Sequence, residues 1–183
     1  MTERSLVPHG SSAEQPALAI VARAELEERS STVRFSYRLT GDLSQVAIPH
    51  RQRSQRAERL WEHTCFEAFI APGPGPRYFE LNFSPSTLWA AYVLDDYRKG
   101  MRPLTLAAAP AIAVARTPNE LHVTAAIEVG AFAQAPWPWR IGLTAVVEDR
   151  AGGRAYFALV HPRENPDFHD AAGFAVLLDG SAR

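Results

Sequence analysis

Short stretches of alternating apolar and polar residues, separated by turn-forming residues, run through most of this chain of 183 residues. The clearest covers residues 32–40, where every second residue is apolar: Val33, Phe35, Tyr37 and Leu39. Successive side chains of a β-strand point to opposite faces, so this alternation indicates a strand with one buried face. No segment keeps a helical period over several turns, and the chain is therefore predicted to be all-β.

Turn-forming residues divide the sequence into roughly ten short strands. Proline and glycine are concentrated in residues 72–76, and such a connection between two alternating stretches is typical of a hairpin. One helical turn is expected in residues 51–59 and another in residues 130–135. The expected strands are residues 17–26, 32–40, 45–48, 64–71, 77–84, 87–94, 111–116, 120–129, 140–148, 154–160 and 173–178. This succession is typical of a single antiparallel β-sandwich of jelly-roll type.

Length and charge limit the domain organisation and the partners. The chain is long enough for one sizeable domain, which we place at residues 17–183, after a flexible lead at residues 1–16. The formal net charge of -1 provides no general attraction to nucleic acid or to an anionic membrane. No apolar stretch reaches the roughly 18 residues of a membrane helix and no secretory signal is visible, so we expect a cytoplasmic protein. The single cysteine, Cys65, rules out an intrachain disulfide.

Two neighbouring expected strands carry polar side chains in matching rows. One row consists of Trp61, His63, Cys65, Glu67 and Phe69, and the next consists of Tyr78, Glu80, Asn82 and Ser84. If the strands pair as a hairpin, two carboxylates, an amide, an imidazole and several aromatic rings share one sheet face. Aromatic rings stack on sugars, while carboxylates and amides bind sugar hydroxyls. The alternative is an ordinary polar face turned to solvent.

Several segments resemble the DOMON-like domain family, which is similar to family 9 carbohydrate-binding modules. They are residues 60–69 (LWEHTCFEAF), 78–85 (YFELNFSP), 89–92 (WAAY), 97–98 (YR), 161–162 (HP), 166–169 (PDFH) and 173–174 (GF). The resemblance covers most of the chain after residue 17. It implies a β-sandwich that binds a sugar or, in some branches, haem.

The resemblance also implies roles for individual residues. Trp61 has the place of a stacking tryptophan, and Glu67, six positions later, that of the hydroxyl acceptor. Asn82 lies where the sugar-binding modules often use arginine, and Phe168 is the aromatic residue of the late loop. Further ligand-binding candidates are His63, Glu80, Arg98, His161 and His169. We therefore expect a small-molecule binding domain, with a sugar as the leading ligand and no protein partner that the sequence identifies.

Other chemistries remain open. Glu67 and Glu80 could form an acid/base pair for glycoside hydrolysis, or could be paired with a nearby arginine: Arg34, Arg38 or Arg77. Haem would need an axial ligand such as His161 or His169, with Met101 as a second ligand. No spacing typical of a zinc site is present. We expect no metal and no cofactor, and we favour binding over catalysis.

Three further sets of residues have both a functional and a structural interpretation. The arginines of residues 51–59 could hold a phosphate or carboxylate, or could belong to a solvated loop. Arg98 could reach the ligand, or could pair with Asp95 or Asp96. Trp137 and Trp139 flank a proline, and we expect at least one of them to fill the core.

Overall fold

The computed structural model describes residues 3–12, 17–27, 32–132 and 135–179. These residues form twelve strands and four short 3-10 turns, which confirms the all-β class. The strands are β1 (Arg4–Pro8), β2 (Ala19–Glu27), β3 (Thr32–Thr40), β4 (Cys65–Pro72), β5 (Tyr78–Phe83), β6 (Trp89–Leu94), β7 (Arg102–Pro103), β8 (Ala111–Arg116), β9 (Glu120–Glu128), β10 (Trp139–Glu148), β11 (Arg154–Ala158) and β12 (Val176–Leu178). The 3-10 turns are η1 (Leu43–Gln45), η2 (Leu60–Glu62), η3 (Val129–Phe132) and η4 (Ala171–Gly173).

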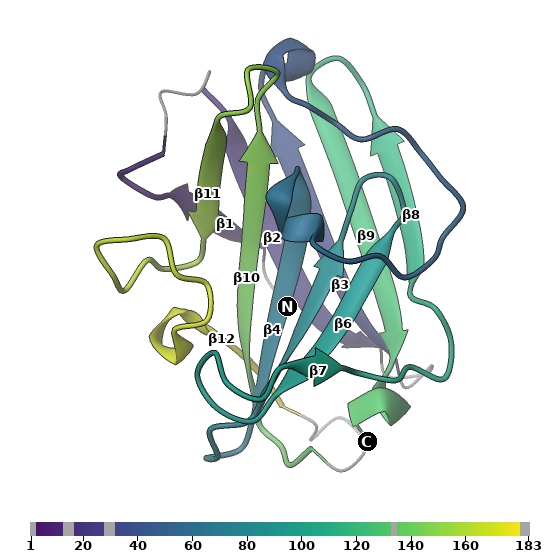
Figure 1. Cartoon of the computed structure of the whole chain (residues 1–183), viewed down its shortest axis with the longest axis vertical. Coiled ribbons are helices and arrows are strands. Elements are labelled where there is room, and N and C mark those ends of the chain that lie inside the picture. The colour runs from purple at the N-terminus through teal and green to yellow at the C-terminus, as the bar shows by residue number, and fades with distance from the viewer. Residues whose placement is uncertain (1–2, 13–16, 28–31, 133–134, 180–183) are drawn as a thin grey trace.

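All strand pairs are antiparallel and belong to one continuous sheet, which curls into a half-barrel (Figure 1). The order is β7-β6-β5-β4-β10-β11-β1-β2-β3-β9-β8, with β12 paired to β10. β1 connects the two halves, because residues 4–6 pair with β2 while residues 7–8 pair with β11. The two-sheet sandwich and its jelly-roll order therefore stay predictions.

The inner faces of the two halves meet in the main core. β3 buries every second residue, as its alternation predicts. Phe35 stacks on Phe83 of the other half at 5.8 Å between ring centroids, and Tyr37 packs on Phe66 at 5.1 Å. The Tyr37 hydroxyl donates a hydrogen bond to the backbone carbonyl of Glu67 (2.7 Å). Burial of these large side chains supplies most of the stabilisation of such a fold.

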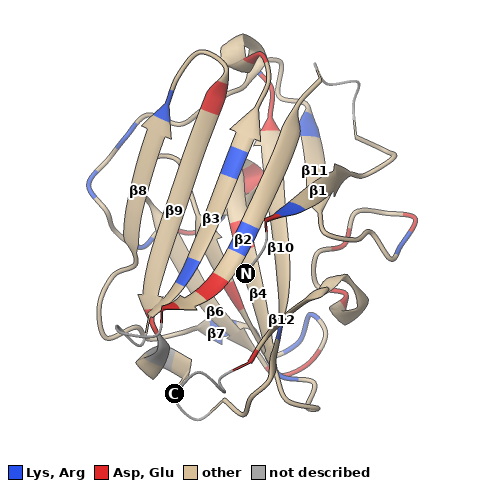
Figure 2. Cartoon of the chain, turned by 180° about the vertical axis from the view of Figure 1, so that it is seen from behind, with Lys and Arg blue, Asp and Glu red and all other residues tan. Residues whose placement is uncertain are grey.

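The outer face of the β2–β3–β9–β8 half carries charged residues. Figure 2 shows basic residues along β2 and β3 and acidic residues along β2. Arg34 pairs with Glu27 (2.5 Å) and Arg38 with Glu3 (2.9 Å). Neither arginine is therefore a partner of Glu67 or Glu80, and Arg77 instead lies 3.6 Å from Asp95.

In the other half of the sheet, β4, β5 and β6 are buried on both faces, because a second core lies on their outer side. Every residue of β4, β5 and β6 is buried. The second core contains Leu60, Cys65, Phe69, Ala71, Tyr78, Ala90, Tyr92, Leu94 and Phe174. Phe174, at the end of η4, stacks on Phe69 at 5.6 Å. The segment after β11 thus covers a face that the solvent-face alternative would leave open.

Three local predictions are wrong. Residues 4–8 of the expected flexible lead form β1, whose Leu6 is buried in the main core; residues 1–2 and 13–16 lie outside the described part. Residues 45–48 contribute a single bridge, Val46 to Asp149, instead of a strand. Residues 51–59 are not helical, because their backbone hydrogen-bonds to residues 86–89 instead, for example from the Ala57 N–H to the Trp89 carbonyl (2.9 Å). The Arg56 side chain donates to the carbonyls of Ala91 (2.9 Å) and Leu104 (2.5 Å).

The tryptophan pair belongs to the core, as expected for at least one of its members. Trp139 is completely buried, and Trp137 stacks on it at 3.9 Å between centroids.

Within the described residues, no helix has the length and apolar character needed to span a membrane. The cytoplasmic location stays a prediction.

Candidate ligand-binding site

The hairpin of β4 and β5 aligns the two expected polar rows. Glu67 lies opposite Asn82, and Phe69 lies opposite Glu80. Residues directly opposite each other in an antiparallel pair project from the same face. Both glutamates therefore belong to the outer face, beside the second core.

A cavity of about 360 Å³ opens on this face. Its lining combines the two carboxylates with aromatic and basic side chains, including Trp61, Glu67, Glu80, Arg98, Tyr156 and Phe168. Trp61 comes from η2, Tyr156 from β11, and Phe168 from the segment between β11 and β12. The edge of Phe168 meets Tyr156 at 6.0 Å between centroids, so aromatic rings from distant parts of the chain form one wall.

Each glutamate is held by one of its oxygens. Thr144 donates to Glu67 Oε2 (3.4 Å), and the Asn82 amide donates to Glu80 Oε1 (2.8 Å). The other oxygens, Glu67 Oε1 and Glu80 Oε2, are buried and have no hydrogen-bond partner in the described part of the chain. The two residues are only 3% and 4% exposed. Buried acceptors without partners are rare and call for an explanation such as a ligand.

Burial and mutual repulsion change the acidity of this pair. Burial raises the pKa of Glu67 well above its ordinary value, and the charge of Glu80 raises it further. Burial also raises the pKa of Glu80, against the hydrogen bond from Asn82 and the positive charge of Arg98. Burial and mutual repulsion both favour the protonated forms of these carboxyl groups.

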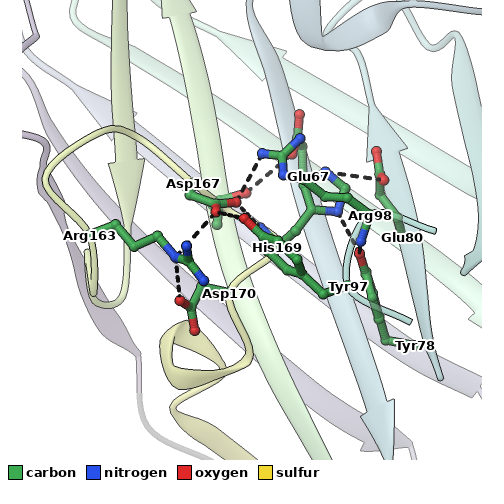
Figure 3. A network of polar contacts seen from close by, with 10 residues as sticks. Glu67, Tyr78, Glu80, Tyr97, Arg98, Arg163, Asp167, His169 and Asp170 are labelled. Atoms are coloured by element: carbon green, nitrogen blue, oxygen red, sulfur yellow. Dashed lines mark hydrogen bonds and ion pairs between the residues drawn. The ribbon is translucent and has the colours of Figure 1, made fainter. Parts of the chain in front are cut away.

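His169 lies between Tyr78 and Glu80 (Figure 3). Burial, followed by the charge of Arg98, lowers the pKa of His169 to about 4, so the ring is neutral near pH 7. Its Nδ1 is 2.8 Å from the Tyr78 hydroxyl, which already accepts the Arg98 backbone N–H (3.2 Å). We therefore assign the Tyr78 proton to the bond with Nδ1 and the ring proton to Nε2, which faces Glu80 Oε2 at 3.9 Å.

Asp167 connects the segment between β11 and β12 to the loop that follows β6 (Figure 3). It accepts hydrogen bonds from Arg98 Nη2 (2.9 Å), the Tyr97 hydroxyl (2.5 Å) and the His169 backbone N–H (3.1 Å). Arg163 lies 3.5 Å away. Burial alone would raise the pKa of Asp167, but the bonds from Tyr97 and Arg98 outweigh it and lower that pKa. Arg98 is therefore paired with Asp167, not with Asp95 or Asp96.

Five of the eight ligand-binding candidates lie around the cavity: Trp61, Glu67, Glu80, Arg98 and His169. Asn82 is completely buried and acts on the site through its bond to Glu80. His63 is exposed and pairs with Glu148 (2.8 Å) beside a separate hollow. His161 Nε2 is 2.9 Å from the Val7 carbonyl oxygen, and its ring packs on His9. The structure does not bring these last two residues to the cavity.

The sequence did not single out β11 as part of the site. Arg154 and Tyr156 line the cavity, while Ala155 and Phe157 between and after them are buried in the main core. That alternation is visible in the sequence, but the neighbours of β11 in the sheet are not.

Met101 and His169, two of the possible haem ligands, both line the cavity, although His161 does not. No group of three or more metal-ligating side chains is found in the described part of the chain.

Comparison with known proteins supports the fold. No family model matches the chain, and no curated protein is found to be similar. The structure resembles that of a candidate carbohydrate-binding protein from Bacteroides uniformis ATCC 8492, at 15% identity and a TM-score of 0.62, over 94% of this chain and 84% of the other. It is also similar to a family 9 carbohydrate-binding module from Caldicellulosiruptor kristjanssonii in complex with glucose, at 8% identity and a TM-score of 0.45, over 84% and 74% of the chains.

At these identities the first likeness establishes a shared fold, and the second is too distant to carry an argument. The assignment to the DOMON-like family stays a prediction.

Proposed function

We propose that this domain binds a small sugar or sugar derivative in the cavity between Trp61 and Glu67, without transforming it. The observation that carries the proposal is the pair of buried, unpartnered oxygens, Glu67 Oε1 and Glu80 Oε2, beside a cavity with aromatic walls. Sugar hydroxyls supply the missing donors, and the apolar face of a sugar ring packs on aromatic side chains. The fold shared with a candidate carbohydrate-binding protein and the DOMON-like resemblance both support this assignment.

The size of the cavity limits the ligand. A volume of about 360 Å³ is at the lower end of the roughly 300–1,000 Å³ typical of small-molecule sites. It favours one sugar unit over a long chain. In this arrangement Trp61 stacks on the sugar ring, Glu67 and Glu80 accept hydrogen bonds from its hydroxyl groups, and Asn82 orients Glu80.

Isothermal titration calorimetry against a panel of monosaccharides and disaccharides tests the proposal. We expect Trp61→Ala to lower the affinity for the sugar that binds by about tenfold or more, because a stacking ring is lost. His63→Ala is the control, since His63 lies outside the cavity, and it should leave the affinity unchanged. An absence of binding heat with every sugar would remove the proposal.

Hydrolysis is the second candidate, because two carboxyl groups with raised pKa values share the cavity. Release of nitrophenol from aryl glycosides that is lost in Glu67→Gln would favour hydrolysis over simple binding.

Haem binding has less support, because His161 lies outside the cavity and His169 is engaged by Tyr78. A Soret band in the purified protein would establish it instead.

A further inference from the structure

We propose that the ligand carries a protonated amine, and that this ammonium group binds between Glu67 and Glu80. The inference rests on the proposed function and identifies its ligand class as an amino sugar. It follows from how the two carboxylates are held, from the charges around them and from the walls of the cavity.

The hydrogen-bonding pattern fits an ammonium group. Glu67 and Glu80 come from adjacent strands, and each leaves one oxygen without a partner while the other oxygen is fixed by a neighbour. An ammonium group has three donors and no acceptor, so it can satisfy both open oxygens at once. Bonds between a cation and a carboxylate are also stronger than bonds between neutral groups.

In the described part of the chain, neither Glu67 nor Glu80 has a positively charged ion-pair partner. No ion pair to Glu67 is found in the described part of the chain, and the nearest ring nitrogen to Glu80, His169 Nε2 at 3.9 Å, belongs to a neutral imidazole. Arg98 is already paired with Asp167 at 2.9 Å. Arg154 lines the cavity but is exposed, where water screens its charge. A neutral sugar would supply donors to the unpartnered oxygens but no positive charge to favour ionisation of the pair, whereas an ammonium group supplies both.

The walls are also suited to a cation. Trp61, Tyr156 and Phe168 present aromatic rings to the cavity, and such rings attract an ammonium group as well as the CH face of a sugar. An amino sugar uses both properties in one molecule. A simple aliphatic amine would use only the first.

The test compares matched ligands that differ at one position. D-Glucosamine, D-galactosamine and D-mannosamine are titrated beside the corresponding neutral sugars and N-acetylated sugars, at about pH 6, where a sugar amine is protonated. We expect the amine of at least one trio to bind about tenfold more tightly than its two counterparts, because charged hydrogen bonds replace neutral ones.

Variants locate the effect. Glu67→Gln and Glu80→Gln keep an acceptor oxygen and lose the charge, so each should reduce the preference for the amine over its neutral counterpart to about threefold or less. Glu120→Gln, on β9 in the other half of the sheet, is the matched control and should keep the full preference. Thermal melting of each variant establishes that it is folded.

Proton release is a second readout. Ammonium binding should ionise the glutamate pair and release protons, which titrations in two buffers of different ionisation enthalpy will measure; neutral sugars should release none. The titratable and charged groups around the pair are Tyr37, Cys65, Tyr78, Tyr92, Arg98, Arg154, Tyr156, Asp167 and His169.

The outcomes separate the two proposals. Neutral and N-acetylated sugars that bind as tightly as the amines would overturn the ammonium site and leave sugar binding intact. A preference for amines that persists in both glutamine variants would also overturn it. If no sugar binds, with or without an amine, the proposed function fails and the inference fails with it.

Discussion

At the scale of single residues, small contacts decide how the two glutamates are presented. Thr144 and Asn82 each fix one carboxylate oxygen, and the second oxygen of each glutamate is buried without a hydrogen-bond partner in the described residues. Asn82 was expected to touch the ligand, yet it is completely buried and supports Glu80 instead. A residue on the correct face of a strand can therefore act one contact away from the ligand.

Gly142 shows how tightly the second core closes under the cavity. A Cβ at this position of β10 would lie 2.5 Å from the ring of Phe174 and 3.4 Å from Cβ of Phe69. The ring would have to move away, taking the covering segment with it. Only a residue without a side chain permits this close approach.

We therefore predict that Gly142→Ala lowers the free energy of unfolding by about 1–3 kcal/mol through overpacking. Gly75→Ala is the control, because nothing lies within 4 Å of its added Cβ, and it should change that free energy by no more than about 0.5 kcal/mol. Urea unfolding followed by tryptophan fluorescence measures both. Equal effects of the two substitutions would contradict the close packing described for Phe174.

At the scale of elements, the segment between β11 and β12 covers one half of the sheet. Its Phe168 and His169 line the cavity, and Phe174 fills the second core. Asp167 ties this segment to the loop that follows β6 through Tyr97 and Arg98. The segment is therefore held at both the cavity and the core.

We predict that Asp167→Asn loosens this connection, because the charged acceptor for Arg98 is lost. Amide hydrogen exchange in residues 161–170 should become about tenfold faster or more, and the affinity for the sugar should fall. Asp96→Asn, at an exposed ion pair 3.8 Å from Lys99, is the control and should alter neither quantity. Unchanged exchange in Asp167→Asn would show that other contacts of the segment, such as those of Phe174 and His169, hold it without Asp167.

At the scale of the whole molecule, buried ionisable groups of the site affect folding stability in opposite directions. The folded-state pKa values of Glu67 and Glu80 are raised, so the folded state binds more protons than the unfolded state above the usual glutamate pKa. Their contribution to stability is therefore largest at acidic pH and falls as the pH rises. The pKa of His169 is lowered to about 4, so its contribution rises between about pH 4 and the usual histidine pKa near 6.5.

We predict that Glu67→Gln gains stability relative to the original protein as the pH rises from about 5 to about 8. Removal of a group that must ionise at a buried site should change the difference in unfolding free energy by about 1 kcal/mol or more over this interval. Urea unfolding at several pH values measures it, with Glu120→Gln as the control that shows no such trend. A constant difference would mean that Glu67 is ionised as easily in the folded state as in water.

Alternation alone determined much of the architecture. The bounds predicted for β3 and β8 agree with the structure, and the inner rows of β4 and β5 fill the main core as their pattern indicates. The hairpin that places Glu67 and Glu80 on one face also follows from local sequence, because its turn is short and rich in proline and glycine. These features depend on neighbours a few residues apart.

Only the tertiary structure decided which distant segments meet. β1 pairs with β11, so that Val7 lies beside Ala158, and residues 154–156 and 166–169 complete a cavity whose first member is Trp61. The alternation of residues along a strand indicates which side chains share a face. It does not indicate what covers that face or which strand lies next to it. The same hairpin row could therefore face water, and it became a buried acidic site because contacts between residues 91 and 70 positions apart in the sequence closed over it.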